Sequence, residues 1–201
     1  MKILGITGGV GAGKSTILAY LSAQHHARVI QADEVGKLLQ EPGQECYRKI
    51  VEVFGGDILQ EDGCIDRKKL AAAVFADASR LEVLNRIVHP AVKTCIAAEL
   101  EKEKKKGVVP FCVIEAALLL EDKYDLICDE IWYIHTDAAV RMARLAESRG
   151  YSEEKSRQIM KNQLSEEEYR AKCNFVIDNS SDFVENTYEQ IDKGLVEHGF
   201  L

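Results

Sequence analysis

GGVGAGKS, at residues 8–15, is the stretch that decides the fold of this chain. It matches the pattern G-x4-G-K-[S/T] and lies between an apolar run, residues 3–7, and a helix-like run, residues 16–21. Glycines allow the backbone to curl so that several N–H groups point at one phosphate chain. A strand, a glycine loop and a helix in this order predict a phosphate-binding loop, or P-loop, rather than a glycine-rich turn without a ligand.

The residues that open the following helix carry the predicted chemistry of this loop. The helix adds the positive end of its dipole near Lys14. The Lys14 ammonium can reach the β- and γ-phosphates of a nucleotide, and the Ser15 hydroxyl can ligate Mg²⁺. The predicted ligands are therefore ATP and Mg²⁺, and the predicted nucleotide-binding residues of the loop are Gly11, Ala12, Gly13, Lys14, Ser15 and Thr16.

The composition fits one domain with an inserted lid. The chain has 201 residues, of which 46% are hydrophobic, which is ample for a core. The formal net charge of −7 argues against a surface for nucleic acid or for anionic membranes. No apolar run approaches the roughly 18 residues that span a bilayer. The six cysteines form no C-x-x-C pair, so we expect reduced thiols in a cytoplasmic protein, and we expect a monomer.

Strand-like and helix-like segments alternate along the chain, which predicts an α/β fold of the P-loop type with a parallel five-stranded sheet. The expected strands are residues 2–7, 29–32, 108–114, 130–134 and 175–177. Asp66 is expected to cap a helix, and Pro90 to end or kink another near His89. The predicted parts are a core (about 1–33, 107–140 and 172–201), a helical insertion (about 34–106) and a lid (about 141–171).

Asp33 stands at the end of the second expected strand. Ligands of open α/β sheets bind beyond the carboxyl ends of the strands. An aspartate there could take a proton from a hydroxyl group, or hold Mg²⁺ through water. The alternative, which is compatible with the first, is an N-cap for a helix over residues 34–40.

The sequence Asp33-Glu34-Val35-Gly36 also matches the D-x-x-G element of a GTPase switch. It follows the P-loop too closely for a switch segment to intervene, and no asparagine is followed by lysine, so the guanine-reading N-K-x-D is absent. Both observations argue against a GTP-driven switch.

Several other charged residues have two open interpretations. Glu115 ends an apolar strand, where it could lie near Mg²⁺ or face solvent. Arg141, Arg144 and Arg149 lie near one another on a predicted helix and could form the basic side of a lid, since guanidinium groups suit phosphoryl oxygens. The alternative is surface salt bridging with nearby glutamates, which the sequence favours for Arg141. His89, a lone histidine at a kink, is more typical of a structural residue.

One set of motifs runs through almost the full chain in a characteristic order. It comprises TGGVGAGKST at 7–16, Ala32-Asp33, Glu41-Pro42-Gly43, Phe54-Gly55, the block from Asp62 to Leu70, Val74-Phe75, His89-Pro90, Leu118-Leu119 with Glu121, Arg144, Gln163, and Val176 to Asn179. Together these motifs resemble the dephospho-CoA kinase family. The P-loop is common to many families, but its combination with Ala-Asp, the Asp62 block and His-Pro is highly specific.

The resemblance implies ATP-dependent phosphorylation of the ribose 3′-hydroxyl of dephospho-CoA, with Asp33 as the base and Lys14 and Arg144 as the other catalytic residues. It also places His89 and Glu121 in substrate binding and gives the helical insertion the role of receiving the acceptor. The loop after Asn179 would pack near the adenine, so Asn179 joins the nucleotide-binding residues. The segment from Arg144 to Gln163 would form the lid over ATP.

Three departures from the family pattern bear on these roles. Gln31 replaces the first acid of Asp-Ala-Asp, so Asp33 alone can serve as base. Ala117 replaces the proline of Pro-Leu-Leu-x-Glu, which removes a rigid turn and keeps the acid Glu121. The usual R-x3-R becomes Arg144-x4-Arg149, a shift of about 100° around a helix, which favours Arg144 as the catalytic arginine.

Two rival functions share the loop. One is another P-loop kinase that acts on a nucleotide or a different small metabolite. The other is a regulator that binds ATP without transferring phosphate, which gives no reason for Asp33 beside the loop.

Overall fold

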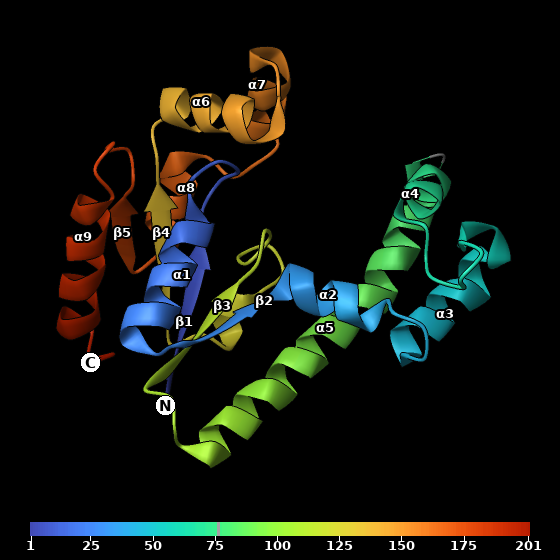
Figure 1. The fold of residues 1–201 in the computed structure, drawn as a ribbon, viewed down its shortest axis with the longest axis horizontal. Coiled ribbons are helices and arrows are strands. Elements are labelled where there is room, and N and C mark those ends of the chain that lie inside the picture. The colour runs from blue at the N-terminus through green and yellow to red at the C-terminus, as the bar shows by residue number, and fades with distance from the viewer. Residues whose placement is uncertain (76) are drawn as a thin grey trace. The chain divides into compact units, whose positions relative to one another are not determined.

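A five-stranded sheet, in the order β2-β3-β1-β4-β5, organises the described chain in the computed structural model (Figure 1). The structure describes residues 1–75 and 77–201. The chain divides into two units, one formed by Met1–Ile30 with Lys106–Leu201 and the other by Gln31–Lys105. The parallel five-stranded sheet predicted from the sequence is confirmed.

The strands are short and mostly apolar because the central ones are covered on both faces. Every residue of β3 is buried, and β1 is buried over its last four residues. In the parallel register Leu4 lies opposite Val113 of β3 and Glu130 of β4. The strands are β1 (Lys2–Thr7), β2 (Arg28–Gln31), β3 (Phe111–Glu115), β4 (Glu130–His135) and β5 (Phe175–Asp178).

Two expected strand ends are wrong. The strand expected at 108–114 begins only at Phe111, because Pro110 has no N–H to donate to a neighbouring strand, and Val108 is exposed. The second strand ends at Gln31, and Ala32 already belongs to a helix. Gln31 is the N-cap of that helix, so the alternative of Asp33 as N-cap is also wrong.

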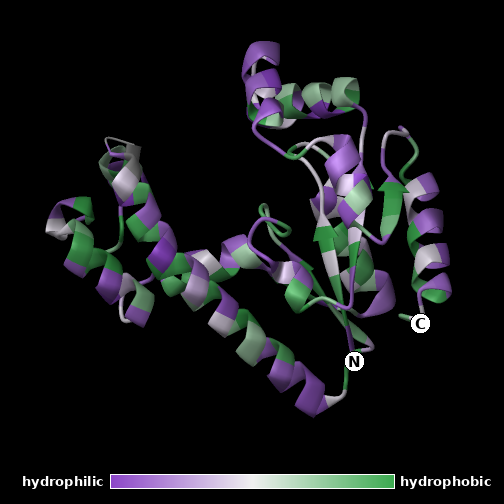
Figure 2. Ribbon diagram, turned by 180° about the vertical axis from the view of Figure 1, so that it is seen from behind, coloured by the Kyte–Doolittle hydropathy of each residue, from purple (hydrophilic) through white to green (hydrophobic). Residues whose placement is uncertain are grey.

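Helices cover both faces of the sheet in the first unit. Residues of β1 and β4 that alternate toward one face, such as Ile6 and Trp132, form one core with α1 and α9. Trp132 contacts the rings of Phe175 and Phe200, with centroids 4.9 Å and 5.7 Å away. On the other face Tyr133 stacks on Tyr169 of α8 at 4.6 Å. Figure 2 shows the hydrophobic residues concentrated along the strands between these helices.

The helices of the first unit are α1 (Lys14–His25), α6 (Ala138–Arg149), α7 (Glu153–Lys161), α8 (Glu166–Lys172) and α9 (Val184–Glu197), with a 3₁₀ turn at Tyr124–Leu126. The charged segment at 152–171 thus contains two helices, α7 and α8. The second begins with a capping box between Ser165 and Glu168.

The second unit is helical, with its own apolar cluster. Its helices are α2 (Ala32–Leu39), α3 (Glu45–Phe54), α4 (Arg67–Phe75) and α5 (Ala78–Lys106), with a 3₁₀ turn at Gly56–Ile58. The cluster is formed by Cys46, Ile50, Ile58, Ile65, Leu70 and Val74. Asp66 caps α4 as predicted, since its carboxylate accepts the backbone N–H groups of Lys68 and Lys69 at 2.8 and 3.1 Å.

Of the two outcomes expected at Pro90, an end or a kink of the helix near His89, the end is wrong, because α5 continues through it to Lys106. Proline removes the N–H that would reach the carbonyl of Arg86. Apolar residues on both sides of Pro90, including Ile87 and Ala91, pack on the cluster of the second unit. This burial holds the helix together across the missing hydrogen bond.

The six cysteines are free, as expected. Burial raises the pKa of the Cys128 thiol to about 12 and that of Cys173 to about 11.

Over the described residues, none of the helices has the length and apolarity that crossing a membrane requires.

Gly194→Ala tests the packing of α9 on the sheet. A Cβ at Gly194 would lie 2.8 Å from Phe175 Cε1 and 3.0 Å from Trp132 Cη2, and Trp132 is fully buried. We expect the free energy of unfolding to fall by about 1–3 kcal/mol, measured by urea titration.

Gly36→Ala is the matched control, because it also lies inside a helix but its Cβ would meet Val92 at an ordinary 3.6 Å. Alanine's higher helix propensity should leave stability unchanged or raise it by up to about 1 kcal/mol. Equal stabilisation by both substitutions would contradict the packing account.

Candidate nucleotide-binding and active site

The P-loop joins β1, which ends at Thr7, to α1, which begins at Lys14. Its curl depends on glycine at both ends. Gly8 has φ +152°, and a Cβ there would lie 2.7 Å from the carbonyl oxygen of Ile134. Gly13 has φ +83°, and a Cβ there would collide with the side chain of Asn179. Side chains at these positions are therefore excluded by strain and by space.

Lys14 lies across this loop. Its ammonium donates to the carbonyl oxygen of Gly8 at 2.8 Å and lies 3.8 Å from a carboxylate oxygen of Glu115. Glu115 is the last residue of β3 and is only 9% exposed. Of the two interpretations of Glu115, the solvent-facing one is therefore wrong, and the acid lies beside the P-loop lysine.

The residues present fit a magnesium ion shared with a nucleotide. Ser15 and Thr16 are exposed in the first turn of α1, so their hydroxyl groups are accessible. No cluster of three or more acidic, histidine or cysteine side chains suited to a metal occurs in the described ranges. Mg²⁺ bound through phosphates needs only one or two protein ligands, and the Ser15 hydroxyl can supply one.

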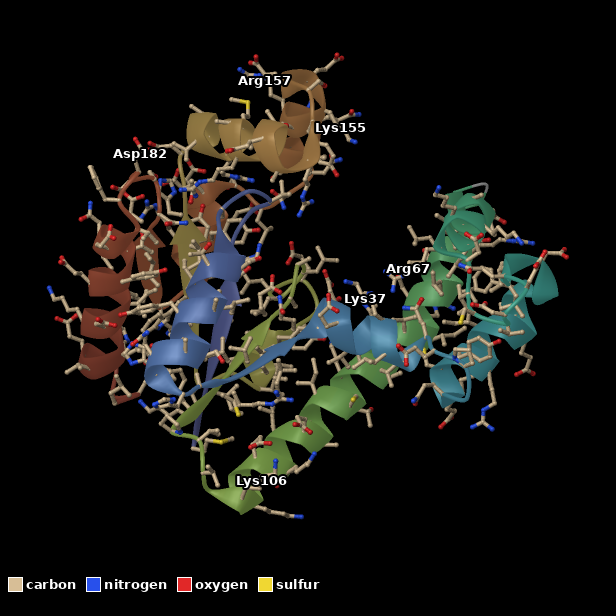
Figure 3. The ribbon with its side chains drawn as sticks, viewed as in Figure 1. Lys37, Arg67, Lys106, Lys155, Arg157 and Asp182 are labelled. Atoms are coloured by element: carbon tan, nitrogen blue, oxygen red, sulfur yellow. The ribbon has the colours of Figure 1, made fainter. Side chains whose placement is uncertain are left out.

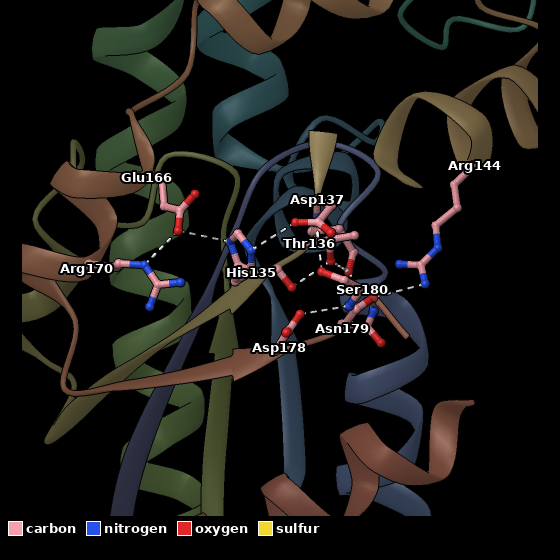
Figure 4. A network of polar contacts seen from close by, with 10 residues as sticks. His135, Thr136, Asp137, Arg144, Glu166, Arg170, Asp178, Asn179 and Ser180 are labelled. Atoms are coloured by element: carbon pink, nitrogen blue, oxygen red, sulfur yellow. Dashed lines mark hydrogen bonds and ion pairs between the residues drawn. The ribbon is translucent and has the colours of Figure 1, made fainter. Parts of the chain in front are cut away.

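A network of polar side chains, including Thr136 and Asn179 (Figure 4), holds Ala12 in place. The carbonyl oxygen of Ala12 accepts hydrogen bonds from Asn179 Nδ2 at 2.8 Å and from the Thr136 hydroxyl at 3.1 Å. The Thr187 hydroxyl donates to Asn179 Oδ1 at 2.9 Å. Both ends of the Asn179 amide are therefore used within the protein, and its side chain supports the P-loop from β5.

Arg144 reaches the same place from α6. One guanidinium nitrogen donates to the Asn179 carbonyl oxygen at 3.1 Å. The other, Nη1, is buried without a hydrogen-bond partner in the described structure and lies 3.2 Å from where a Cβ on Gly13 would be. A buried, unpartnered guanidinium nitrogen is costly, and an anion beside Gly13 would satisfy it.

The interpretation of Arg141 as a surface residue is wrong. Its Nε donates to the Val10 carbonyl oxygen at 2.8 Å, and Nη2 donates to Gln163 Oε1 at 2.7 Å. Burial lowers the pKa of this guanidinium. Arg149, by contrast, is exposed and lies over the ring of Tyr151 at 6.0 Å.

Charged groups surround the ends of β4 and β5 near this network (Figure 4). His135 lies 3.6 Å from both Asp137 and Glu166, and Glu166 pairs with Arg170 at 2.7 Å. The hydrogen bond from Ser180 is the main cause that lowers the pKa of Asp178. The loop after β5 is thereby fixed where it supports Asn179.

The remaining predicted residues are distributed over both units. Glu121 is exposed in the first unit. The pKa of Tyr169 is raised to about 12, mainly by the burial of the phenol and next by the negative charge of Glu121. Asp33 is exposed in the first turn of α2, two residues after β2, and His89 is half-buried on α5. These two belong to the second unit. Figure 3 labels Lys37 of α2 and Arg67 of α4, which add positive charge to that unit.

The comparison with protein families decides the identity of the chain. A family model described as dephospho-CoA kinase matches residues 2–185. The chain belongs to the dephospho-CoA kinase family. A dephospho-CoA kinase of Shouchella clausii is 33% identical over 194 residues, 96% of this chain and 97% of that one. One of Geobacter sulfurreducens is 36% identical over 197 residues, 98% of this chain and 96% of that one.

Solved structures show the same fold over almost the whole chain. TT1252 from Thermus thermophilus superposes with a TM-score of 0.83 at 26% identity, covering 98% of this chain and 97% of that one. Dephospho-CoA kinase from Campylobacter jejuni has a TM-score of 0.73 at 21% identity over the full length of both chains. At that identity the second likeness shows the fold alone.

The sequence did not indicate which side chains from other elements support the P-loop by hydrogen bonds. Thr136 and Thr187 belong to no motif, and Gln163 was noted only as part of the family pattern. Two of the three have partners far away in sequence: Ala12 is 124 residues from Thr136, and Val10 is 153 residues from Gln163. The alternation of strands and helices indicates which segments are neighbours but not which side chains bond.

Asn179→Asp tests the support of the P-loop. The substitution replaces the donating Nδ2 of Asn179 with a carboxylate oxygen, which cannot donate to the Ala12 carbonyl oxygen. The buried hydrogen bond between these two groups is therefore lost. We expect a loss of about 1–3 kcal/mol of stability and weaker ATP binding. Thermal unfolding and nucleotide titration measure the two effects. Asn186→Asp, at an exposed amide bonded to Ser181, should change neither, and equal effects at both positions would refute the role of Asn179.

Proposed function

We propose that this chain transfers the γ-phosphoryl group of ATP to the 3′-hydroxyl of the ribose of dephospho-CoA, giving coenzyme A and ADP. The match to the dephospho-CoA kinase family over residues 2–185 carries the proposal. The intact P-loop, with Lys14 and Glu115 beside it, agrees with the use of ATP. Curated relatives with this name match 95–98% of the chain in several cases.

Positive groups around the P-loop stabilise the phosphoryl group during transfer. The backbone N–H groups of Gly11 to Thr16 bind the phosphates. The Lys14 ammonium, which donates to the Gly8 carbonyl oxygen in the structure, donates to phosphate oxygens when ATP is bound. The buried Nη1 of Arg144 donates a hydrogen bond to an oxygen of the transferring phosphoryl group. The guanidinium thereby stabilises the negative charge spread over the phosphoryl oxygens. When bound, Mg²⁺ supplies further neutralisation of the phosphates, and the Ser15 hydroxyl is the residue that would hold it.

Asp33 acts as the general base. Its carboxylate takes the proton of the 3′-hydroxyl as that oxygen bonds to the γ-phosphorus. The bond between this phosphorus and the oxygen of ADP breaks, and ADP leaves with the electron pair. With glutamine at position 31, Asp33 is the only acid of the family's Asp-Ala-Asp pattern that remains. Its exposed position at the start of α2 leaves it accessible to a substrate.

The other parts bind and enclose the substrates. The helical insertion, residues 34–106, receives the acceptor with His89, and Glu121 contributes from the loop after β3. The lid, residues 141–171, covers ATP and excludes water. The loop after Asn179 lies at the adenine. The free thiols agree with a cytoplasmic enzyme, and we propose that it acts as a monomer.

An acceptor assay tests this function directly. Incubation with ATP, Mg²⁺ and dephospho-CoA should give a product heavier by one phosphoryl group, detected by mass spectrometry, with an equal amount of ADP. A panel of nucleotides and small metabolites serves as control acceptors. Transfer to one of these in place of dephospho-CoA would favour another small-molecule kinase, and ATP binding without any transfer would favour a regulator.

Asp33→Asn tests the base. The amide cannot accept the proton, so kcat should fall by about 10²-fold or more while ATP affinity stays nearly unchanged. Steady-state kinetics and nucleotide titration provide the two values. Glu34→Gln, at the neighbouring exposed acid that pairs with Lys37, should retain near-normal turnover. Near-normal turnover by Asp33→Asn would overturn the assignment.

A further inference from the structure

Both peptide groups of Val10, at the tip of the P-loop, are held by two side chains from the following part of the chain. The Val10 N–H donates to Gln163 Oε1 at 3.1 Å. The Val10 carbonyl oxygen accepts Arg141 Nε at 2.8 Å. Arg141 Nη2 donates to the same Gln163 oxygen at 2.7 Å, which closes a ring of three hydrogen bonds. We refer to Val10, Arg141 and Gln163 as the Val10 clasp.

The clasp joins three separate segments of the first unit. Val10 lies between β1 and α1, Arg141 lies on α6, and Gln163 lies between α7 and α8. The Arg141 guanidinium lies directly on Gly9, where any Cβ would collide with it, so glycine at this position makes room for the arginine. The position of the lid helices is thereby linked to the shape of the loop.

The surroundings of Arg141 do not neutralise its charge. Its hydrogen-bond acceptors are a carbonyl and an amide, and within the described residues no carboxylate forms an ion pair with it. The rings of Tyr133 and Tyr169 are its other neighbours. Burial raises the pKa of both phenols, that of Tyr169 to about 12, so they stay protonated at neutral pH. The charge of this half-buried cation is therefore left uncompensated by the protein, which favours an anion close to it.

We propose that Arg141 is a positioning residue for ATP, which together with Gln163 fixes the Val10 peptide and so sets the P-loop in its phosphate-binding shape before the nucleotide arrives. This rests on the proposed use of ATP. Because the clasp shapes the loop equally for the bound substrate and for the transition state, it contributes to affinity rather than to the chemical step. Arg144, whose unpartnered nitrogen faces Gly13, has the complementary role in the chemical step.

Arg141→Met tests the clasp, because methionine fills much of the space and donates no hydrogen bond. The KM for ATP and the dissociation constant of its non-hydrolysable β,γ-imido analogue should both rise about tenfold. The kcat at saturating ATP should stay within about twofold. Gln163→Leu should have the same effect, and the double variant should be little worse than either, since each breaks one shared ring of bonds.

Arg141→Lys separates hydrogen-bond geometry from charge. Lysine keeps the charge but cannot bond to the Val10 carbonyl and to Gln163 with a planar fork, so most of the loss in affinity should persist. Arg157→Met is the matched control, since Arg157 is an exposed arginine on α7 that pairs with Glu153, and it should bind the analogue normally. Thermal unfolding checks that each variant is folded, and Gln163→Leu with Arg141→Lys carry the test if Arg141→Met does not fold.

The proposal is overturned if Arg141→Met binds the analogue as tightly as the natural chain, or if Arg141→Lys restores full affinity. It is equally overturned if the losses of the two single variants multiply in the double variant, or if kcat falls while KM does not change. Binding of the analogue needs no acceptor. A chain that failed to phosphorylate dephospho-CoA would therefore still report on the clasp, which keeps the two failures distinguishable.

Discussion

The carbonyl oxygen of Ala12 is the point on which the site depends. A loop of glycines has little structure of its own, because it makes few internal hydrogen bonds and glycine loses the most entropy on ordering. Asn179 and Thr136, from the ends of β5 and β4, both donate to this oxygen, and Thr187 holds Asn179 in turn. The parallel sheet brings these strand ends to the same edge, so the fold supplies what the loop lacks.

Electrostatics then make the loop suitable for phosphates in a chain whose net charge is −7. Lys14, Arg141 and Arg144 concentrate positive charge at one place, while the acid beside them, Glu115, pairs with Lys14. Local charge, rather than the field of the whole protein, determines what binds. The two arginines lie three residues apart on α6, so one helix delivers both to opposite ends of the loop.

Local patterns predicted much of this molecule. The P-loop, the sheet and the cap at Asp66 follow from short-range rules that tertiary structure did not change. The errors arise where distant contacts decide. Pro90 does not end α5, because apolar packing on both sides outweighs one lost hydrogen bond. Arg141 has glutamates near in sequence, but its partners are Val10, 131 residues away, and Gln163. Asn179 likewise bonds to Ala12 across 167 residues, which periodicity cannot indicate.

The burial of two free cysteines limits their reaction with the thiol compounds on which this enzyme acts. Dephospho-CoA and coenzyme A both end in a thiol, and their oxidised forms are disulfides that thiolates attack. Because the pKa of Cys128 is about 12 and that of Cys173 about 11, both stay as unreactive thiols at neutral pH. Burial thus makes these side chains poor nucleophiles, and mixed disulfides between them and the compounds that the enzyme handles form slowly.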